Sequence, residues 1–448
     1  MASRRRLTTR IVSAWYGLIW LLLLAAASYP VARGHSLTSS PSVISLATFV
    51  VFSVLAIRIE TRLFACVALT TLVVPFYMFE AYLWWTAVPD RTASRIVHIT
   101  KLREQGAAAY PAVFPSGFRR LWPRPGYNSR SPIVIGGREV LPLAGIPDVL
   151  TVYCYTADLG VITYRSDAFG FRNPTNAGPR AAPEFALLGD SFVHGTCVSD
   201  PFTYAEQMSV LGPTASYGIN GTSALTQLAI YREYVKALRP HHILWFFYEG
   251  NDPGEYLAER TWPLLRAYFE RDHLQDLASL NRCLSLAMKR FIDQRLGSVE
   301  VATLGHEEIP SMSREMVDFL LLRRARAASR LVRTPTHPDL TEAEWREITD
   351  VWREVVETQR MQGGQITFVY IPEHLRFLAH DPTPFQALER KVVTLWSDLS
   401  VDYVSLTDSL EAVEDPLAYY DNLHFNEEGY RLTAEAILKH LRRSLAHG

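Results

Sequence analysis

The sequence contains three side chains of the types that activate an alcohol for attack on an acyl group: Ser191, Asp421 and His424. A serine hydroxyl is a weak nucleophile until a base accepts its proton, and an imidazole is suited to that role. A carboxylate can then fix the tautomer and orientation of the imidazole. Because Asp421 precedes His424 by three positions, we predict that this pair acts on a Ser191 nucleophile.

Ser191 stands where a predicted strand ends and a predicted helix begins. Residues 185–188 form an apolar run typical of a buried parallel strand. Gly189 and Asp190 separate this run from Ser191, and we expect Asp190 to support the turn through backbone hydrogen bonds. Ligands bind at the carboxyl ends of strands in open α/β sheets, so the position of Ser191 suits a reactive group.

Three hydrogen-bond donors are predicted to stabilise the negative charge that develops during such an attack. They are the backbone amides of Ser191 and Gly218 and the side-chain amide of Asn251, which follows the buried run 242–248. His194 lies close to Ser191 in the sequence, and we expect it to be structural or to line the pocket rather than to act as a second base.

Together these segments resemble the SGNH (GDSL) hydrolase family. The resemblance covers residues 184–446 and implies a three-layer α/β/α flavodoxin-like domain, with esterase, lipase or acyl-transfer chemistry that needs no cofactor. One departure is that Gly250 directly precedes Asn251, where the family often places another residue between them. The matching blocks are Gly189-Asp190-Ser191, Gly218, Asn251-Asp252, and Asp421 to His424.

The remainder of this segment alternates predicted strands and helices, a pattern typical of a parallel sheet. Strands are expected at 365–372 and 403–406 and a helix at 385–396, while Thr341 and Glu344 form a capping box at the start of another helix. Residues 253–335 are predicted to be a largely helical insertion that partly covers the site.

The amino-terminal part, residues 1–87, is predicted to be a membrane region with helices at about 11–31, 38–57 and 63–85. Each apolar run approaches the roughly 20 residues that span a bilayer. The arginines before residue 11 and at 58–62 are expected on the cytoplasmic side, which places the chain after residue 88 outside.

Two alternatives remain open for this membrane region. The first run could be a cleaved signal peptide with a small-residue site at 25–27, and the second run could be re-entrant. Glu80 is interpreted as an interfacial carboxylate.

Residues 88–183 are predicted to be an extracytoplasmic connecting region with short strands and no clear helix, because proline, glycine and arginine are frequent. The four cysteines are widely spaced and form no CxxC pair, which does not favour a metal site. A disulfide among Cys154, Cys197 and Cys283 is left open, and Cys197 is expected to be a small buried side chain.

Acidic and basic residues nearly balance at 46 and 45, so the charge indicates no nucleic-acid partner.

The leading prediction is a membrane-anchored, extracytoplasmic serine esterase that acts on O-acyl (acetyl) esters of a glycan or lipid. Its expected partners are the bilayer and the acyl-ester substrate; no protein partner is indicated. The alternatives are an O-acetyltransferase of cell-surface polysaccharide and a non-catalytic glycan-binding membrane scaffold. A metal-dependent phosphoesterase is not favoured, because the sequence has no cluster of His and Asp residues at a spacing suited to a metal ion.

Overall fold

The chain divides into two compact units, residues 1–88 with 310–333 and residues 89–309 with 334–448. The structure, a computed structural model, describes residues 75–82, 91–121, 133–156, 159–173, 182–294, 296, 338–379, 381–421 and 423–447. In the first unit only the helical segment 75–82 is described, so the membrane spans predicted at 11–31 and 38–57, and most of 63–85, lie outside the described residues. Among the helices that are described, none combines the length and apolarity required to cross a bilayer.

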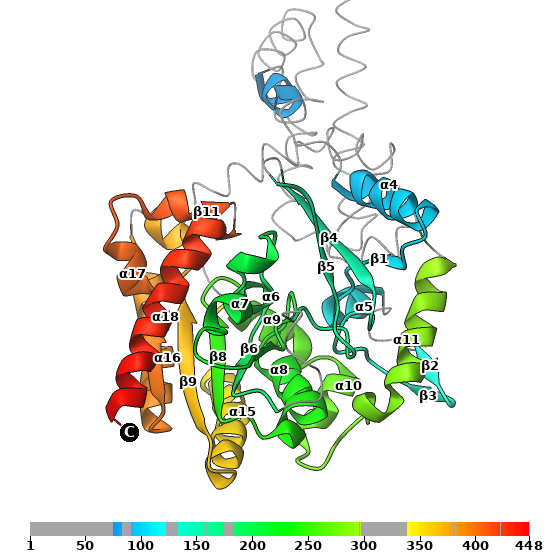
Figure 1. The fold of residues 1–448 in the computed structure, drawn as a ribbon. Coiled ribbons are helices and arrows are strands. Elements are labelled where there is room, and N and C mark those ends of the chain that lie inside the picture. Colours follow the sequence, from blue (N-terminus) through cyan, green and yellow to red (C-terminus); the bar gives the residue numbers. More distant parts are fainter. Residues whose placement is uncertain are drawn as a thin grey trace, which may run out of the picture. The chain divides into compact units, whose positions relative to one another are not determined.

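A five-stranded, wholly parallel sheet forms the centre of the second unit (Figure 1). Its order, β10-β9-β8-β6-β7, is that of flavodoxin-like doubly wound folds, and the strand order reverses between β6 and β8. The parallel α/β sheet predicted from the sequence is therefore confirmed. The strands are β6 (Phe185–Leu188), β7 (Thr214–Ser216), β8 (His242–Tyr248), β9 (Gln365–Ile371) and β10 (Asp402–Ser405).

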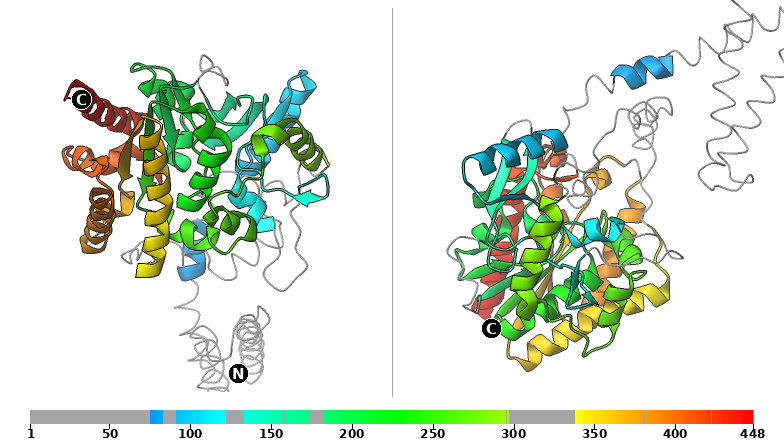
Figure 2. Two further views of the ribbon diagram at one scale, coloured as in Figure 1. Left: turned by 90° about the horizontal axis from the view of Figure 1, so that it is seen from below. Right: turned by 90° about the vertical axis from the view of Figure 1, so that its right-hand side faces the viewer.

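Helices cover both faces of this sheet, which explains why its central strands are apolar without alternation. Along β8, Ile243, Trp245 and Phe247 pack into one core, whereas Leu244, Phe246 and Tyr248 pack into the other. The first core lies under α8 (Ala224–Ile230), α15 (Glu342–Met361) and α16 (Thr383–Asp398). The second lies under α7 (Tyr204–Met208), α17 (Thr407–Glu411) and α18 (Glu427–His447), so that α15 and α18, yellow and red in Figure 2, belong to different layers.

The insertion after β8 is helical where it is described. It contains α9 (Asp252–Glu259), α10 (Pro263–Arg266), η5 (Ala267–Phe269) and α11 (Leu277–Asp293), and the predicted remainder, 297–335, lies outside the described residues. Glu259 of α9 accepts hydrogen bonds from the backbone amides of Ser223 and Thr226 at 2.6 and 3.1 Å. These amides belong to the start of α8 and have no partner within the helix, so Glu259 caps that helix.

The capping box predicted at the start of α15 is confirmed. Thr341 Oγ1 accepts from the Glu344 amide at 3.3 Å, and the Glu344 carboxylate accepts from the Thr341 amide at 2.8 Å. Shorter elements join the main ones: η2 (Asp200–Phe202), the π-helical turn η3 (Tyr231–Val235), η4 (Lys236–Leu238), η6 (His374–Phe377) and η7 (Pro416–Tyr419).

The region before β6 packs on the same hydrophobic core as α8 and α15, and it contains helices. The prediction of no clear helix there is wrong. Helix α4 is held by long-range contacts: Ile99 is fully buried, and Arg95 donates to the Tyr153 carbonyl at 2.7 Å. Local composition does not reveal such contacts. The elements are α4 (Arg91–Glu104), β1 (Ala109–Pro111), α5 (Pro115–Leu121), β2 (Val134–Ile135), β3 (Arg138–Glu139), β4 (Leu150–Thr156) and β5 (Gly160–Arg165).

Candidate active site

Ser191 begins a one-turn helix, α6 (Ser191–His194), directly after β6. Asp190 caps this helix by accepting from the Phe192 amide at 3.0 Å. Gly189 is required at the turn, because a Cβ there would lie 2.5 Å from Val193 Cγ2 and 3.0 Å from Phe246 Cβ. The turn thus presents Ser191 at the carboxyl edge of the sheet, next to the reversal in strand order.

His424 is far from this turn in the sequence, near the carboxyl end of the chain, but contacts it in the fold. It lies on β12 (His424–Phe425), and its Nε2 is 2.8 Å from Ser191 Oγ, although 233 positions separate the two residues. Burial, followed by the nearby His374, lowers the pKa of His424 to about 4. The ring is therefore neutral near pH 7, and its Nε2 lone pair can accept the serine proton when Nδ1 carries the hydrogen.

The Ser191 hydroxyl has a second acceptor within reach, Asp190 Oδ2 at 3.1 Å. Burial raises the pKa of Asp190 to about 6, while hydrogen bonds from Phe192, Ser191 and Asn251 act in the opposite direction. A hydroxyl carries one proton, and the contact with His424 is the shorter of the two. Asp190 thus supports the turn, as predicted, and also competes for the serine proton.

Asp421 lies opposite His424 on a short antiparallel ribbon formed by β11 (Tyr420–Asp421) and β12. Directly opposed residues of an antiparallel pair project from the same face of the ribbon, so the register places the two side chains side by side. Asp421 is exposed, however, and it is not among the influences that shift the pKa of His424. Its predicted role as the orienting acid therefore depends on the register.

The Gly218 loop after β7 packs directly on the helix that carries Ser191. A Cβ at Gly218 would lie 2.4 Å from the His194 nitrogen and 2.5 Å from the Val193 carbonyl carbon, so only glycine allows this approach. The Gly218 amide donates to Ser216 Oγ at 3.3 Å, and its carbonyl lies 3.1 Å from His194 Nδ1.

Asn251 occupies the N-cap position of α9, after the end of β8, but its side chain makes no capping hydrogen bond. Its side chain acts to lower the pKa of Asp190, and its Oδ1 is buried without a partner among the described residues. The departure at Gly250 has a structural cause: the Tyr248 ring folds over it, and a Cβ there would lie 2.5 Å from the Tyr248 hydroxyl oxygen. The Gly218 amide is engaged by Ser216 Oγ in this structure, and the roles of the Ser191 and Gly218 amides and of the Asn251 side chain as oxyanion donors stay a prediction.

His194 is enclosed by the rings of Phe114, Tyr153 and Tyr164, whose centroids lie 4.8–5.4 Å away. Burial lowers its pKa to about 3, so the ring stays neutral and its Nδ1–H can donate to the Gly218 carbonyl. These contacts fit the structural role expected from the sequence.

A disulfide between Cys154 and Cys197 joins β4 to the loop after α6. Cys197 is thus not a free small side chain, and of the pairings that the sequence left open this is the one that links the connecting region to the nucleophile turn. Cys283 is exposed and unpaired. Among the described residues, no group of three or more His, Cys, Asp or Glu side chains is arranged so that it could hold a metal ion.

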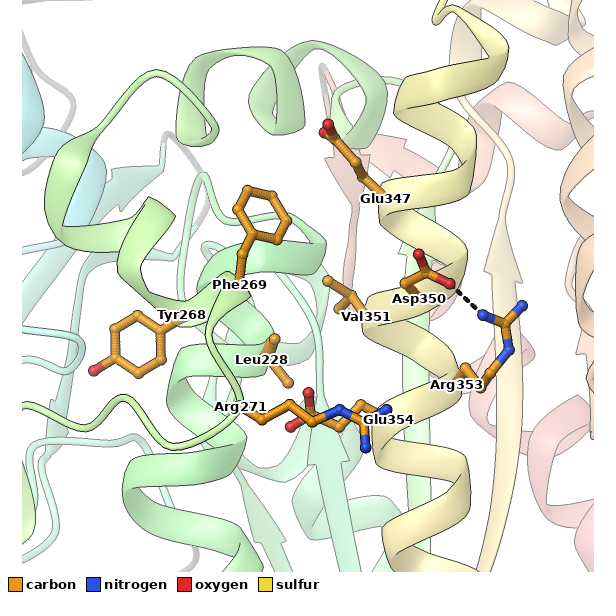
Figure 3. Close-up of a pocket in the computed structure, with 9 residues that line it drawn as sticks. All are labelled: Leu228, Tyr268, Phe269, Arg271, Glu347, Asp350, Val351, Arg353 and Glu354. Carbon is orange, nitrogen blue, oxygen red and sulfur yellow. Dashed lines mark hydrogen bonds and ion pairs between the residues drawn. The ribbon is translucent and has the colours of Figure 1, made fainter.

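Two cavities of the second unit lie among its helices, and neither of these two is lined by Ser191 or His424. One, of about 360 Å³, lies between α8, η5 and α15, where Phe269 and Glu347 project into the same space (Figure 3). The other, of about 490 Å³, shares those two residues and extends to the end of α9.

No family model and no curated protein matches the sequence. Solved structures do resemble the chain. A putative acylhydrolase from Bacteroides fragilis is 12% identical over 61% of this chain and 92% of its own, with a TM-score of 0.31. An esterase from Pseudoalteromonas sp. is 9% identical over 58% and 98%, with a TM-score of 0.32. An acetyl xylan esterase is 12% identical over 57% and 98%, with a TM-score of 0.31. Similarity of this degree assigns no function, so the assignment depends on the geometry of the site.

Proposed function

We propose that the protein is an SGNH-type serine esterase that cleaves O-acyl esters. The observation that carries this proposal is the 2.8 Å contact between Ser191 Oγ and His424 Nε2 at the carboxyl edge of a parallel sheet. A serine at a helix start is usually only a cap. Here Asp190 supplies the cap, and the Ser191 hydroxyl is instead directed at a neutral imidazole.

In the proposed reaction, His424 Nε2 takes the Ser191 proton as Oγ attacks the acyl carbonyl carbon. The carbonyl π electrons move to oxygen, and the amides of Ser191, Gly218 and Asn251 stabilise that oxyanion. Collapse of the tetrahedral intermediate breaks the ester C–O bond, and His424 returns its proton to the departing alcohol. Water then attacks the acyl-serine, with His424 again as base, and releases the carboxylic acid. Asp421 orients the imidazolium from the adjacent position on the ribbon.

The proposed setting is outside the cytoplasm, with residues 1–87 as the membrane anchor. The disulfide between Cys154 and Cys197 supports it, because such bonds persist in oxidising compartments. An acyl ester of a glycan or a lipid, such as an O-acetyl group, is the proposed substrate.

A fluorophosphonate probe tests this function on the full-length protein. We expect covalent labelling of the wild type and none of Ser191→Ala. Ser209→Ala is the matched control, because Ser209 is exposed and its hydroxyl donates to the carbonyl of nearby Glu206. An unlabelled wild type would favour the non-catalytic scaffold.

Mass spectrometry of an oligosaccharide incubated with the protein and an acetyl donor would distinguish transfer of the acetyl group to the sugar from release of acetate.

A further inference from the structure

Tyr153, on β4 in the region before the α/β sheet, contacts two separate loops of the candidate site. Its hydroxyl lies 2.8 Å from Thr196 Oγ1, in the loop after the nucleophile helix. The same hydroxyl accepts from Asn220 Nδ2 at 2.6 Å, in the loop that contains Gly218. Tyr153 is buried, with 4% of its surface exposed, so no solvent competes for these bonds.

The donor and acceptor roles in this network are fixed at each step. Thr196 Oγ1 donates to the Ser191 carbonyl at 2.9 Å, so it must accept from Tyr153. Tyr153 in turn accepts from Asn220. Burial raises the pKa of Tyr153 to about 12, so the phenol keeps the proton that it donates. An ordered chain therefore leads from Asn220 through Tyr153 and Thr196 to the backbone of the nucleophile itself.

The strand that carries Tyr153 is itself held in place. Cys154 forms the disulfide with Cys197, so two successive residues of β4 hold two successive residues of the loop. On the other side, Arg95 of α4 donates to the Tyr153 carbonyl at 2.7 Å. The Tyr153 ring also packs edge-on against His194, whose Nδ1 contacts the Gly218 carbonyl.

We propose that Tyr153 is a positioning residue that couples the nucleophile turn to the Gly218 loop and so sets the distance between nucleophile and oxyanion donors. The inference deepens the proposed esterase function and rests on it. On this inference, the region before the sheet contributes to the geometry of the active site. A small displacement of reacting groups, of about 1 Å, can cost about 100-fold in rate. The Tyr153 hydroxyl bonds to Thr196 and Asn220 rather than to Ser191 Oγ, so its effect should appear in the rate of the chemical step.

The test compares Tyr153→Phe with Tyr155→Phe in the full-length protein. Tyr155 lies on the same strand, and its hydroxyl has no hydrogen-bond partner in the described part of the chain. We expect Tyr153→Phe to lower kcat for a 4-nitrophenyl acyl ester, and the rate constant for fluorophosphonate labelling, by about 10- to 100-fold. KM should change by less than about twofold, because uniform substrate binding is not affected. Tyr155→Phe should match the wild type in both measurements.

A double-mutant cycle separates positioning from a general loss of folding. Thr196→Val removes the next hydroxyl with little change in shape, and thermal unfolding gives the folded fraction of each variant. If Tyr153 acts through Thr196, the double variant should be no slower than the slower single variant. The inference would be overturned if the effects of the two substitutions on kcat were fully additive, or if Tyr153→Phe raised KM alone. It would also be overturned if the loss of activity equalled the unfolded fraction, or if Tyr153→Phe were labelled at the wild-type rate. A wild type that fails to react would overturn the esterase proposal, and this inference with it.

Discussion

Ser191 Oγ and His424 Nε2 lie within hydrogen-bond distance because two loops leave the same end of the molecule. One loop leaves the end of β6, and the other is the β11–β12 ribbon that precedes the carboxyl-terminal helix α18. The Phe192 ring lies 5.0 Å from the His424 ring and 4.5 Å from the Tyr248 ring, so apolar packing accompanies the polar contact. This packing partly shields the half-buried imidazole from water, and burial is the main reason for its low pKa.

The pH dependence of kcat/KM should report the His424 base. A base works in its neutral form, so activity falls as the pH drops through the pKa of His424, at about 4, rather than near 6.5 as for an exposed imidazole. His374 lowers that pKa, so His374→Gln should move the acidic limb to higher pH. The measurement is a pH–rate profile of both proteins. An unchanged limb in the variant would contradict the expected influence of His374, and a separate limb near pH 6 would report Asp190.

Asp421→Asn tests whether the exposed carboxylate orients His424. In a protease with a buried acid, the equivalent change costs about 10⁴-fold in kcat. Asp421 is exposed, so solvent screens its charge and we expect a smaller loss, on the order of 10²-fold. Steady-state kinetics give the value, and Asp408→Asn, at another exposed acid, is the control. Wild-type kcat in Asp421→Asn would remove this residue from the mechanism.

The sequence was sufficient to predict β8 and β9 nearly to the residue, because both are long apolar runs between turns. It also predicted that His424 is the base for Ser191, because Ser191 ends the Gly189-Asp190-Ser191 block and His424 ends the block that begins at Asp421. The link between Cys154 and Cys197 could not be predicted, because no spacing rule relates cysteines on elements that meet only in the folded chain. The same holds for Tyr153, whose hydroxyl gains its role from loops 43 and 67 positions away.

Removal of the disulfide should lower stability. Its two cysteines are 43 positions apart, and closure of a loop of that length corresponds to about 4 kcal/mol in the chain-entropy account. We expect Cys154→Ser combined with Cys197→Ser to lower the free energy of unfolding by about 2–4 kcal/mol in denaturant titration. Cys283→Ser is the matched control, because that thiol is exposed and unpaired. Equal stability of the double variant and the wild type would contradict the prediction.

Gly218→Ala tests the close contact between the oxyanion loop and the nucleophile helix. The added Cβ would meet backbone atoms of Val193 and His194 at 2.4–2.5 Å, so the loop must move away from α6. We expect kcat to fall by about 10²-fold, because the Gly218 amide moves relative to Ser191. Gly254→Ala is the control, since a Cβ there meets only Pro338 Cγ, at an ordinary 3.7 Å. If Gly218→Ala remained folded with wild-type kcat, the loop would not contribute to the oxyanion site.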